Sequence, residues 1–418
     1  MAVGEAAVGE AVESEQRGAV ASGSADASET TLRDGRGQRL LGAFTAAHFS
    51  HHVSNSLLNP LLPFIRDSFA LSYAQSAFLV SAFSLSLGLS NAPIGALADK
   101  VGSRPVIVWG LVLTGAVSAA IAFATEYWHL FALLVVLGLV AGSYHAPAAA
   151  LLARAFPARA RGTAMGFHIT GGHLSFFAVP LAASSLVALT GSWTTPYLWL
   201  AWAPLVTAAM IWYVVPKGYE RAAGATDRWA VFRELRSVLR TVGPLVSASI
   251  LFQMSYAAML AFMTLYFVDV KGIDRYTAAA LFGVPHLVGL IGAPLGGWLS
   301  DRIGRKAVIM IGIGIMGPAV LTMTVVPNEL ILLPLIVIGF AAALRMVVTE
   351  VLVMDSAPDH RRATVMGSYH MLTQELGGLA APVLGTLATI FGIGVAFGGF
   401  AMLLAGASVV IVLLGRRL

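Results

Sequence analysis

The sequence is dominated by apolar stretches that are each long enough to cross a lipid bilayer. Because an α-helix rises 1.5 Å per residue, about 20 apolar residues span the ~30 Å of bilayer hydrocarbon. Twelve such stretches follow one another from Leu40 onward, with approximate ranges 39–63, 74–96, 106–125, 128–154, 163–188, 194–215, 242–268, 277–298, 307–326, 329–355, 363–388 and 394–415. The pattern predicts an all-α membrane protein with twelve transmembrane helices.

The composition excludes an ordinary soluble enzyme. Hydrophobic residues make up 57% of the chain and charged residues only 11%, whereas a typical soluble domain has about 45–50% and about 25%. So few charges cannot cover a water-facing surface, so much of the surface must face the lipid bilayer. With no cysteine, disulfides, thiol catalysis and thiolate metal sites are excluded. No basic stripe with interleaved aromatic residues indicates nucleic-acid binding.

The apolar stretches fall into two halves of six. Residues 1–38 lack aromatic residues and are rich in Ala, Gly, Ser and Glu, which predicts a disordered tail. The longest interruption, residues 216–241, carries six Lys or Arg residues and separates a bundle at 39–215 from a bundle at 242–415. If the tail is cytoplasmic, 22 of the 26 Lys and Arg residues lie on the cytoplasmic side. The positive-inside rule then predicts an inner (plasma) membrane protein with both termini in the cytoplasm.

Two segments recur in both halves at nearly the same offset. GALADKVGSRP (95–105) aligns with GWLSDRIGRKA (297–307) at an offset of 202 residues, and RGTAMG (161–166) aligns with RATVMG (362–367) at 201. Such recurrence indicates duplication. Because each half has an even number of spans, the two copies enter the membrane in the same orientation, as parallel repeats.

The duplicated loop resembles the signature of the major facilitator superfamily, G-x-x-x-D-[RK]-x-G-[RS]-[RK]. The first copy has Ser103 where the family usually has a basic residue, and Pro105 directly after the motif, which predicts a looser gate. The resemblance implies two six-helix bundles that expose a central site to alternate sides of the membrane, with these loops as a cytoplasmic gate and no cofactor. The gate positions are Gly95, Asp99, Lys100, Gly102, Arg104, Gly297, Asp301, Arg302, Gly304, Arg305 and Lys306.

A second resemblance is to the fosmidomycin-resistance branch of that superfamily. It rests on His48-Phe49 followed by Asn59-Pro60-Leu-Leu-Pro63, on Leu71-Ser-Tyr-Ala-Gln75, and on Tyr144-His145. The chain departs from that branch in two respects: it lacks an acid near His52, and it reads His-Ala-Pro where the branch has His-Pro. The resemblance implies efflux as the direction of transport.

Ionisable and polar side chains near the middle of the spans are candidates for solute binding or proton coupling, because burying them in hydrocarbon is costly. His48, His51, His52 and Asn55 have helical spacing and predict one polar stripe on the first span. In the superfamily, spans one, four, seven and ten line the central cavity. A lone transmembrane histidine is as often a hydrogen bond between helices as a proton carrier. The candidates are His48, His51, His52, Asn55, His145, His173, His286, Arg345 and Glu375.

A membrane metal enzyme is the remote alternative, because His48-x-x-His51-His52 matches one histidine box of membrane di-iron oxygenases. Such enzymes need several boxes with roughly eight nitrogen ligands, whereas the other histidines here are scattered singly over different spans. We therefore assign no metal and no catalytic residue from the sequence. Gly312-Ile-Gly314-Ile-Met-Gly317 fits a dinucleotide fingerprint formally, but it lies inside an apolar span and indicates helix packing.

The sequence thus predicts a monomeric secondary transporter that exports a small solute, a drug or a metabolite, in exchange for protons. A proton-coupled importer of an organic anion is the alternative. Asp99 and Asp301 are predicted to latch the cytoplasmic ends of the bundles together, and Arg345 to contact the solute. Glu375 is the leading candidate for proton coupling, because pairing with Arg345 in one state and losing it in another would change its proton affinity.

Overall fold

The computed structural model describes residues 34–216, 243–356, 369 and 377–415, and every regular element in these ranges is helical. Nearly all of the predicted tail, the loop at 216–241 and Glu375 lie outside them. Ten helical segments among the described residues are long and apolar enough to cross a membrane, and Gly378–Phe391 is a shorter apolar helix. The first predicted span is not among the ten, and the eleventh is short because its start is not described.

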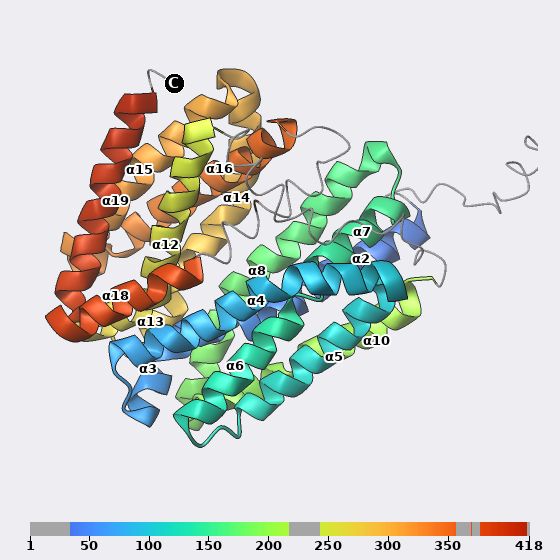
Figure 1. Ribbon diagram of the computed structural model, residues 1–418, viewed down its shortest axis with the longest axis horizontal. Coiled ribbons are helices and arrows are strands. Elements are labelled where there is room, and N and C mark those ends of the chain that lie inside the picture. Colours follow the sequence, from blue (N-terminus) through green and yellow to red (C-terminus); the bar gives the residue numbers. More distant parts are fainter. Residues whose placement is uncertain (1–33, 217–242, 357–368, 370–376, 416–418) are drawn as a thin grey trace, which may run out of the picture.

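The helices form two groups that occupy opposite halves of the molecule (Figure 1). We call the helices before residue 217 the N-terminal bundle and those after residue 242 the C-terminal bundle. The first comprises α2 (Gly35–Asn55), α3 (Leu58–Phe69), α4 (Tyr73–Val101), α5 (Ser103–Ile121), α6 (Tyr127–Ala141), α7 (His145–Ala155), α8 (Ala158–Thr190), α9 (Thr194–Leu200) and α10 (Trp202–Val214). The second comprises α12 (Gly243–Asp269), α13 (Arg275–Leu281), α14 (Val284–Ile303), α15 (Arg305–Val325), η1 (Asn328–Leu330), α16 (Leu332–Ser356), α18 (Gly377–Phe391) and α19 (Ile393–Gly415).

Besides the break between α9 and α10, three spans that the sequence predicts as continuous are divided into two helices near mid-depth. The breaks separate α2 from α3, α6 from α7 and α13 from α14. In each case a proline, Pro60, Pro147 or Pro285, lies in the first turn of the second helix, where its missing N–H removes no hydrogen bond. The breaks place Asn55, His145 and His286 at or next to helix ends, where backbone groups are free to bind other partners.

Close packing of α2 on α8 depends on a glycine pair. A Cβ atom on Gly171 would collide with the backbone oxygen of Thr45, and one on Gly172 would lie 2.8 Å from Cε1 of His48. Small residues at such crossings let helix backbones approach within van der Waals contact. The pair brings the polar stripe of α2 against α8.

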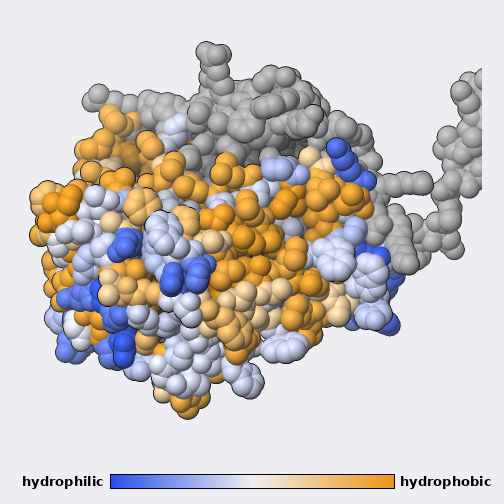
Figure 2. All heavy atoms as spheres, turned by 60° about the horizontal axis from the view of Figure 1, so that its bottom comes forward, coloured by the Kyte–Doolittle hydropathy of each residue, from blue (hydrophilic) through white to orange (hydrophobic). Residues whose placement is uncertain are grey.

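Apolar side chains cover much of the molecular surface (Figure 2). Trp109, Leu89 and Phe123 are between 63% and 75% exposed, which would be unfavourable for large apolar side chains in water. Burial of these side chains in hydrocarbon removes that cost. The surface therefore fits a protein whose helices are surrounded by lipid.

Among the described residues, the two bundles contact each other from mid-depth to one end of the molecule. We call this the distal end, where α3 joins α4 and α12 joins α13; the opposite end, where α4 joins α5 and α14 joins α15, is the motif end. The hydroxyl of Ser184 donates to the carbonyl of Tyr276 at 2.8 Å, and that of Thr264 donates to the carbonyl of Asn59 at 2.7 Å. These bonds between the bundles lie from mid-depth to the distal end.

Candidate functional site

The three histidines of α2 are gathered on the inner side of the N-terminal bundle. His48 and His51 are buried, with 6% and 1% of their surface exposed. Nδ2 of Asn55 lies 3.4 Å from Nε2 of His51, one turn back along the helix. The predicted polar stripe is therefore one connected row of side chains that faces α7 and α8 rather than lipid.

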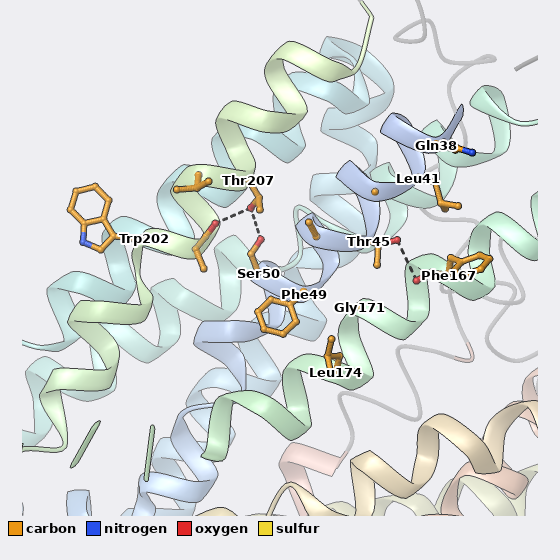
Figure 3. Close-up of a pocket in the computed structure, with 14 residues that line it drawn as sticks. Gln38, Leu41, Thr45, Phe49, Ser50, Phe167, Gly171, Leu174, Trp202 and Thr207 are labelled. Atoms are coloured by element: carbon orange, nitrogen blue, oxygen red, sulfur yellow. Dashed lines mark hydrogen bonds between the residues drawn. The ribbon is translucent and has the colours of Figure 1, made fainter. Parts of the chain in front are cut away.

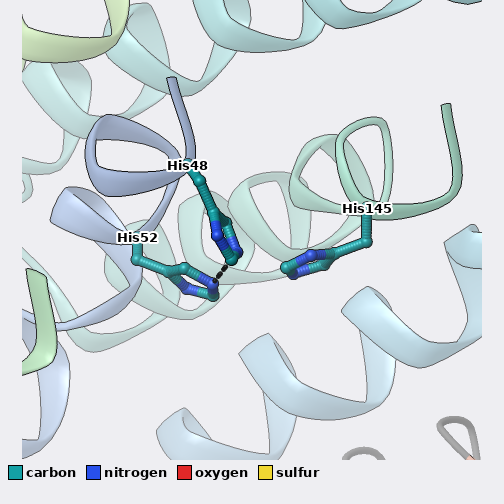
Figure 4. Close-up of side chains that lie close together, drawn as sticks. All are labelled: His48, His52 and His145. Atoms are coloured by element: carbon teal, nitrogen blue, oxygen red, sulfur yellow. Dashed lines mark hydrogen bonds between the residues drawn. The ribbon is translucent and has the colours of Figure 1, made fainter. Parts of the chain in front are cut away.

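Hydrogen bonds define how His48 and His52 are protonated. Nδ1 of His48 lies 2.7 Å from the backbone oxygen of His168, which can only accept, so Nδ1 carries the proton. Nε2 of a neutral His48 is then an acceptor, and Nε2 of His52 lies 3.2 Å from it (Figure 4). Nδ1 of His52 is buried without a hydrogen-bond partner among the described residues. The pair thus leaves one ring nitrogen with unused binding capacity.

His145 lies across from the α2 histidines at the start of α7. Its ring centroid is 5.3 Å from that of His48, 4.8 Å from that of His51 and 5.2 Å from that of His52. The neighbouring Tyr144 stacks on His51 at 4.7 Å. The break between α6 and α7 makes this possible, because it points two consecutive residues into the bundle.

His168 on α8 supports this cluster from behind. Its ring stacks on His48 with centroids 4.2 Å apart. Its Nδ1 lies 3.1 Å from the backbone oxygen of Phe44, and the hydroxyl of Tyr144 donates to the same oxygen at 3.0 Å. His168 is not among the candidates that we selected from the sequence.

An aromatic bridge carries the cluster across to the C-terminal bundle. Phe176 on α8 lies 4.8 Å from His52 and stacks at 4.9 Å on His286 of α14. His173 lies one turn before Phe176 and faces the same helix, since a Cβ atom on Gly289 would be 3.9 Å from its Nδ1. Nε2 of His286 is buried and has no hydrogen-bond partner among the described residues. Phe176 was missed because a phenylalanine in an apolar span carries no signal.

Arg345 lies in the interior of the C-terminal bundle, apart from the histidine cluster. Only 1% of its surface is exposed. Its guanidinium donates to Oγ of Ser249 at 2.8 Å and also to Oε1 of Gln253. These are neutral acceptors, so they stabilise the cation without cancelling its charge. The predicted pair with Glu375 falls outside the described residues.

The duplicated loops have matching backbones. Gly102 has φ 97° and Gly304 has φ 91°, a conformation that costs glycine little and other residues much. Asp301 is bonded within its own loop, to Arg305 at 2.6 Å. The side chain of Asp99 is not among those described. The predicted latch between the bundles is thus not formed by Asp301 in this structure.

The remaining gate positions differ between the copies. Arg104 is buried beside α10, where it donates to the backbone oxygen of Trp212 and lies over the indole ring. In the second copy Arg302 lies over Trp298, with its guanidinium carbon 3.9 Å from the ring centre. Lys100 is exposed and Lys306 is half-buried. A Cβ atom added to Gly95 or Gly297 would have no neighbour within 4 Å.

An ion-pair network that the sequence analysis did not predict joins the bundles at the distal end. Arg66 of α3 forms a two-pronged pair with Asp269 at the end of α12, and the hydroxyl of Tyr73 donates to the same carboxylate at 2.8 Å. Arg275 lies 3.8 Å from Asp67. A carboxylate at a helix C-terminus is unfavourable alone, so Asp269 depends on these partners.

A groove between α2, α8 and α10 is separate from this site (Figure 3). Its walls include Phe49, Leu174 and Trp202, and its polar side chains are mostly engaged, as in the hydrogen bond between Ser50 and Thr207. The groove belongs to the N-terminal bundle alone. Its apolar lining offers a polar solute no charged partner.

A metal ion could be held by one group of side chains among the described residues. Nitrogen atoms of His48, His52 and His145 all lie within 4.8 Å of one another. No carboxylate belongs to the group, so its chemistry differs from that of a calcium or magnesium site.

Comparison with known proteins gives concordant matches along the chain. The family model described as Major Facilitator Superfamily matches residues 44–382 and, in a second overlapping match, residues 280–417. The Fosmidomycin resistance protein of Escherichia coli is 24% identical over 87% of this chain and 89% of its own length. The Phosphoglycerate transporter protein of Salmonella typhimurium is 24% identical over 64% of each chain. A bacterial homolog to the human lysosomal transporter Spinster, in an inward-facing and occupied conformation, superposes with a TM-score of 0.76 at 16% identity, over 92% of this chain and 96% of that one.

Proposed function

Because this chain belongs to the major facilitator superfamily, whose members are transporters and not enzymes, we propose that it exports a small solute in exchange for protons. The observation that carries the proposal is the row of buried histidines that runs from α2 to His286, across the interface between the bundles. Membership in this family also removes the membrane metal enzyme as an alternative. We further propose that the monomer is the transporting unit.

We place the motif end in the cytoplasm of a cell bounded by an inner (plasma) membrane. The support is the strong excess of Lys and Arg residues in the loops at that end and in the segments continuous with it. With this orientation, the contacts between Arg66 and Asp269 close the outer side of the transporter. The pairing of Asp301 with Arg305 inside its own loop fits a state in which the cytoplasmic latch is open.

Alternation would then exchange one set of contacts for the other. Breaking the Arg66–Asp269 pair opens the outer side, and Asp99 and Asp301 latch the cytoplasmic ends to the opposite bundle. The two states differ in contacts of similar chemistry, so their free energies differ by only a few kcal/mol. Binding of a solute or a proton can therefore change which state is more populated.

Proton coupling is assigned to groups at the interface between the bundles. Histidine titrates near neutral pH, and His173 and His286 face each other's bundle at mid-depth. Glu375, which lies outside the described residues, is the second candidate. Among the charged groups of neighbouring helices, Arg345 lies deeper in the C-terminal bundle, and the histidines of α2 lie beyond Phe176.

Import of an organic anion is the second candidate function. Arg345 keeps a full positive charge among neutral acceptors, so it can attract a carboxylate or a phosphate. The name of the phosphoglycerate relative points the same way, whereas that of the fosmidomycin-resistance relative supports efflux.

Reconstitution in proteoliposomes tests both functions. Vesicles with an imposed pH gradient and a pH-sensitive dye inside are challenged with a panel of drugs and organic anions, and solute and proton fluxes are recorded together. Proton-coupled export predicts opposite fluxes, and anion import predicts parallel fluxes. Solute movement that is insensitive to the gradient in every case refutes proton coupling.

Variants then locate the coupling group. Glu375→Gln and His286→Gln are each expected to uncouple proton flux from solute flux, whereas His129→Gln, at an exposed histidine at the start of α6, serves as the matched control. If both variants keep the parent ratio of protons to solute, the assignment to these groups is wrong.

A further inference from the structure

The nitrogen atoms of His48, His52 and His145 lie close enough together for a small movement of the side chains to place them around one metal ion. All lie within 4.8 Å of one another, and Nε2 of His48 is 3.2 Å from Nε2 of His52. Zinc binds imidazole nitrogen at about 2.0–2.1 Å in tetrahedral sites, which places two ligand nitrogens about 3.3 Å apart. The His48–His52 pair meets this distance without movement of the backbone, and His145 closes the triangle from α7 (Figure 4).

The hydrogen bond of His48 also matches the way proteins prepare a metal ligand. Its Nδ1–H donates to the backbone oxygen of His168 at 2.7 Å. Metal-binding histidines commonly donate their second ring nitrogen to a carbonyl in this way, because the bond fixes the tautomer and the direction of the ligand lone pair. Nε2 of His48 is therefore oriented as a ligand towards its neighbours.

The convergence of a third imidazole is a second observation. A hydrogen-bonded pair of histidines would explain the contact between His48 and His52. It would leave unexplained why His145, on another helix, brings a third ring nitrogen within 4.8 Å of that pair. When Nε2 of His52 is the ligand atom, its Nδ1 carries the proton.

We propose that His48, His52 and His145 form a binding site for a divalent transition-metal ion of the zinc type. Three imidazoles suit zinc, cobalt, nickel or copper and disfavour magnesium and calcium, which require oxygen ligands. Three protein ligands leave at least one coordination position for water or for a donor atom of the transported solute. This inference goes beyond the proposed function and does not depend on proton coupling.

The location of the ligands has a consequence for transport. His48 and His52 lie on α2 and His145 lies on α7, so the ion binds to the N-terminal bundle alone. It would not tie the bundles together, and it could remain bound or be carried while they separate. A metal held in this way faces Phe176, on the path to the other bundle.

Zinc binding to the purified full chain tests the proposal. The protein is prepared with an affinity tag that contains no histidine, and Zn²⁺ is titrated by calorimetry, followed by metal analysis after dialysis. One zinc ion per chain is expected, with X-ray absorption showing nitrogen ligands at about 2.0–2.1 Å. Excess Mg²⁺ should not compete.

Single variants identify the ligands. His52→Ala and His145→Gln are each expected to weaken zinc binding at least ~100-fold, since even partners that only orient a ligand contribute about 10–100-fold. His129→Gln, which removes an exposed histidine, should bind zinc as the parent does. The melting temperature without metal shows that each variant is folded. If neither variant folds, the absorption spectrum of the parent decides.

Three results would each overturn the proposal. The parent binds no stoichiometric zinc, its bound zinc has oxygen ligands only, or a folded His52→Ala or His145→Gln variant binds zinc with parental affinity. The last two would place the metal elsewhere on the chain.

Discussion

Removing the charge of Asp269 should open the distal end of the transporter. Asp269→Asn keeps the shape of the side chain but removes the charge that Arg66 and Tyr73 bind across the interface. Because the partners belong to different bundles, these bonds stabilise the state in which the distal end is closed and are lost when it opens. The substitution therefore acts on the balance between states.

The size of the effect follows from the exposure of the pair. A hydrogen bond to a charged group contributes about 1.5–3 kcal/mol when buried, and a fully exposed ion pair about 0.2–1 kcal/mol. The side chains of Arg66 and Asp269 are 16% and 18% exposed, and two bonds to Arg66 and one to Tyr73 are weakened together. A net loss of about 2 kcal/mol corresponds to a roughly 30-fold shift towards the distal-open state.

A single cysteine can report this shift, because the chain has none of its own. Ser184 is 7% exposed and its hydroxyl bonds to Tyr276 of the opposite bundle, so a Ser184→Cys thiol is covered while the distal end is closed. Its labelling rate by a membrane-impermeant maleimide should rise roughly 30-fold in Asp269→Asn. Glu329→Gln, at an exposed acid of the same end, is the matched control.

A double variant separates this pair from a general loss of charge. If Arg66 and Asp269 act through each other, Arg66→Gln combined with Asp269→Asn should label no faster than the stronger single variant. Labelling of Asp269→Asn within twofold of the parent, in protein that is folded and inserted, would refute the reasoning that this network holds the distal end closed.

Three further predictions concern single positions. Arg345→Lys should weaken solute binding about tenfold or more while the protein still inserts, because lysine cannot reproduce the two-sided donation of the guanidinium; unchanged affinity would argue against a contact with solute. Gly172→Ala should lower the free energy of unfolding by about 1–3 kcal/mol, because its Cβ would lie 2.8 Å from Cε1 of His48. Gly166→Ala on the same helix, where a Cβ has no neighbour within 4 Å, should not lower it. Equal melting temperatures of the two variants would contradict this packing. Asp274→Ala should lower the free energy of unfolding by about 1 kcal/mol, because Asp274 caps α13. The hydrogen bond of Thr277 holds the pKa of this carboxyl below its usual value, so its contribution is complete above about pH 4. The difference in stability from the parent should narrow below that pH, as the carboxyl of the folded protein becomes protonated.

Several features of the fold could be predicted from the sequence alone because they depend on local chemistry. Hydropathy identifies the apolar stretches, since only length and apolarity decide whether a helix can cross a bilayer. The duplication predicted that the two loops resemble each other, and Gly102 and Gly304 have nearly the same positive φ. The spacing of His48, His51 and His52 fixed their common face, because an α-helix repeats every 3.6 residues.

The helix breaks were within reach of the sequence but were not predicted. Pro60, Pro147 and Pro285 each lie in the first turn of a helix that follows a break, yet a proline inside an apolar span is also common in continuous membrane helices. Which prolines end a helix depends on whether a neighbouring helix or side chain can satisfy the freed backbone groups, and that is a property of packing.

The composition of the site was decided by tertiary structure. Spacing along α2 places its histidines on one face but does not say that His145 and His168 meet them, because the rotation and depth of each helix follow from how side chains pack. Arg66 and Asp269 are 203 residues apart, and Phe176 is an ordinary apolar residue until His52 and His286 lie on either side of it. The sequence by itself determined which residues are unfavourable to bury in a membrane. Only the packing of the helices determined which of these residues bind one another and so offset the free-energy cost of their burial.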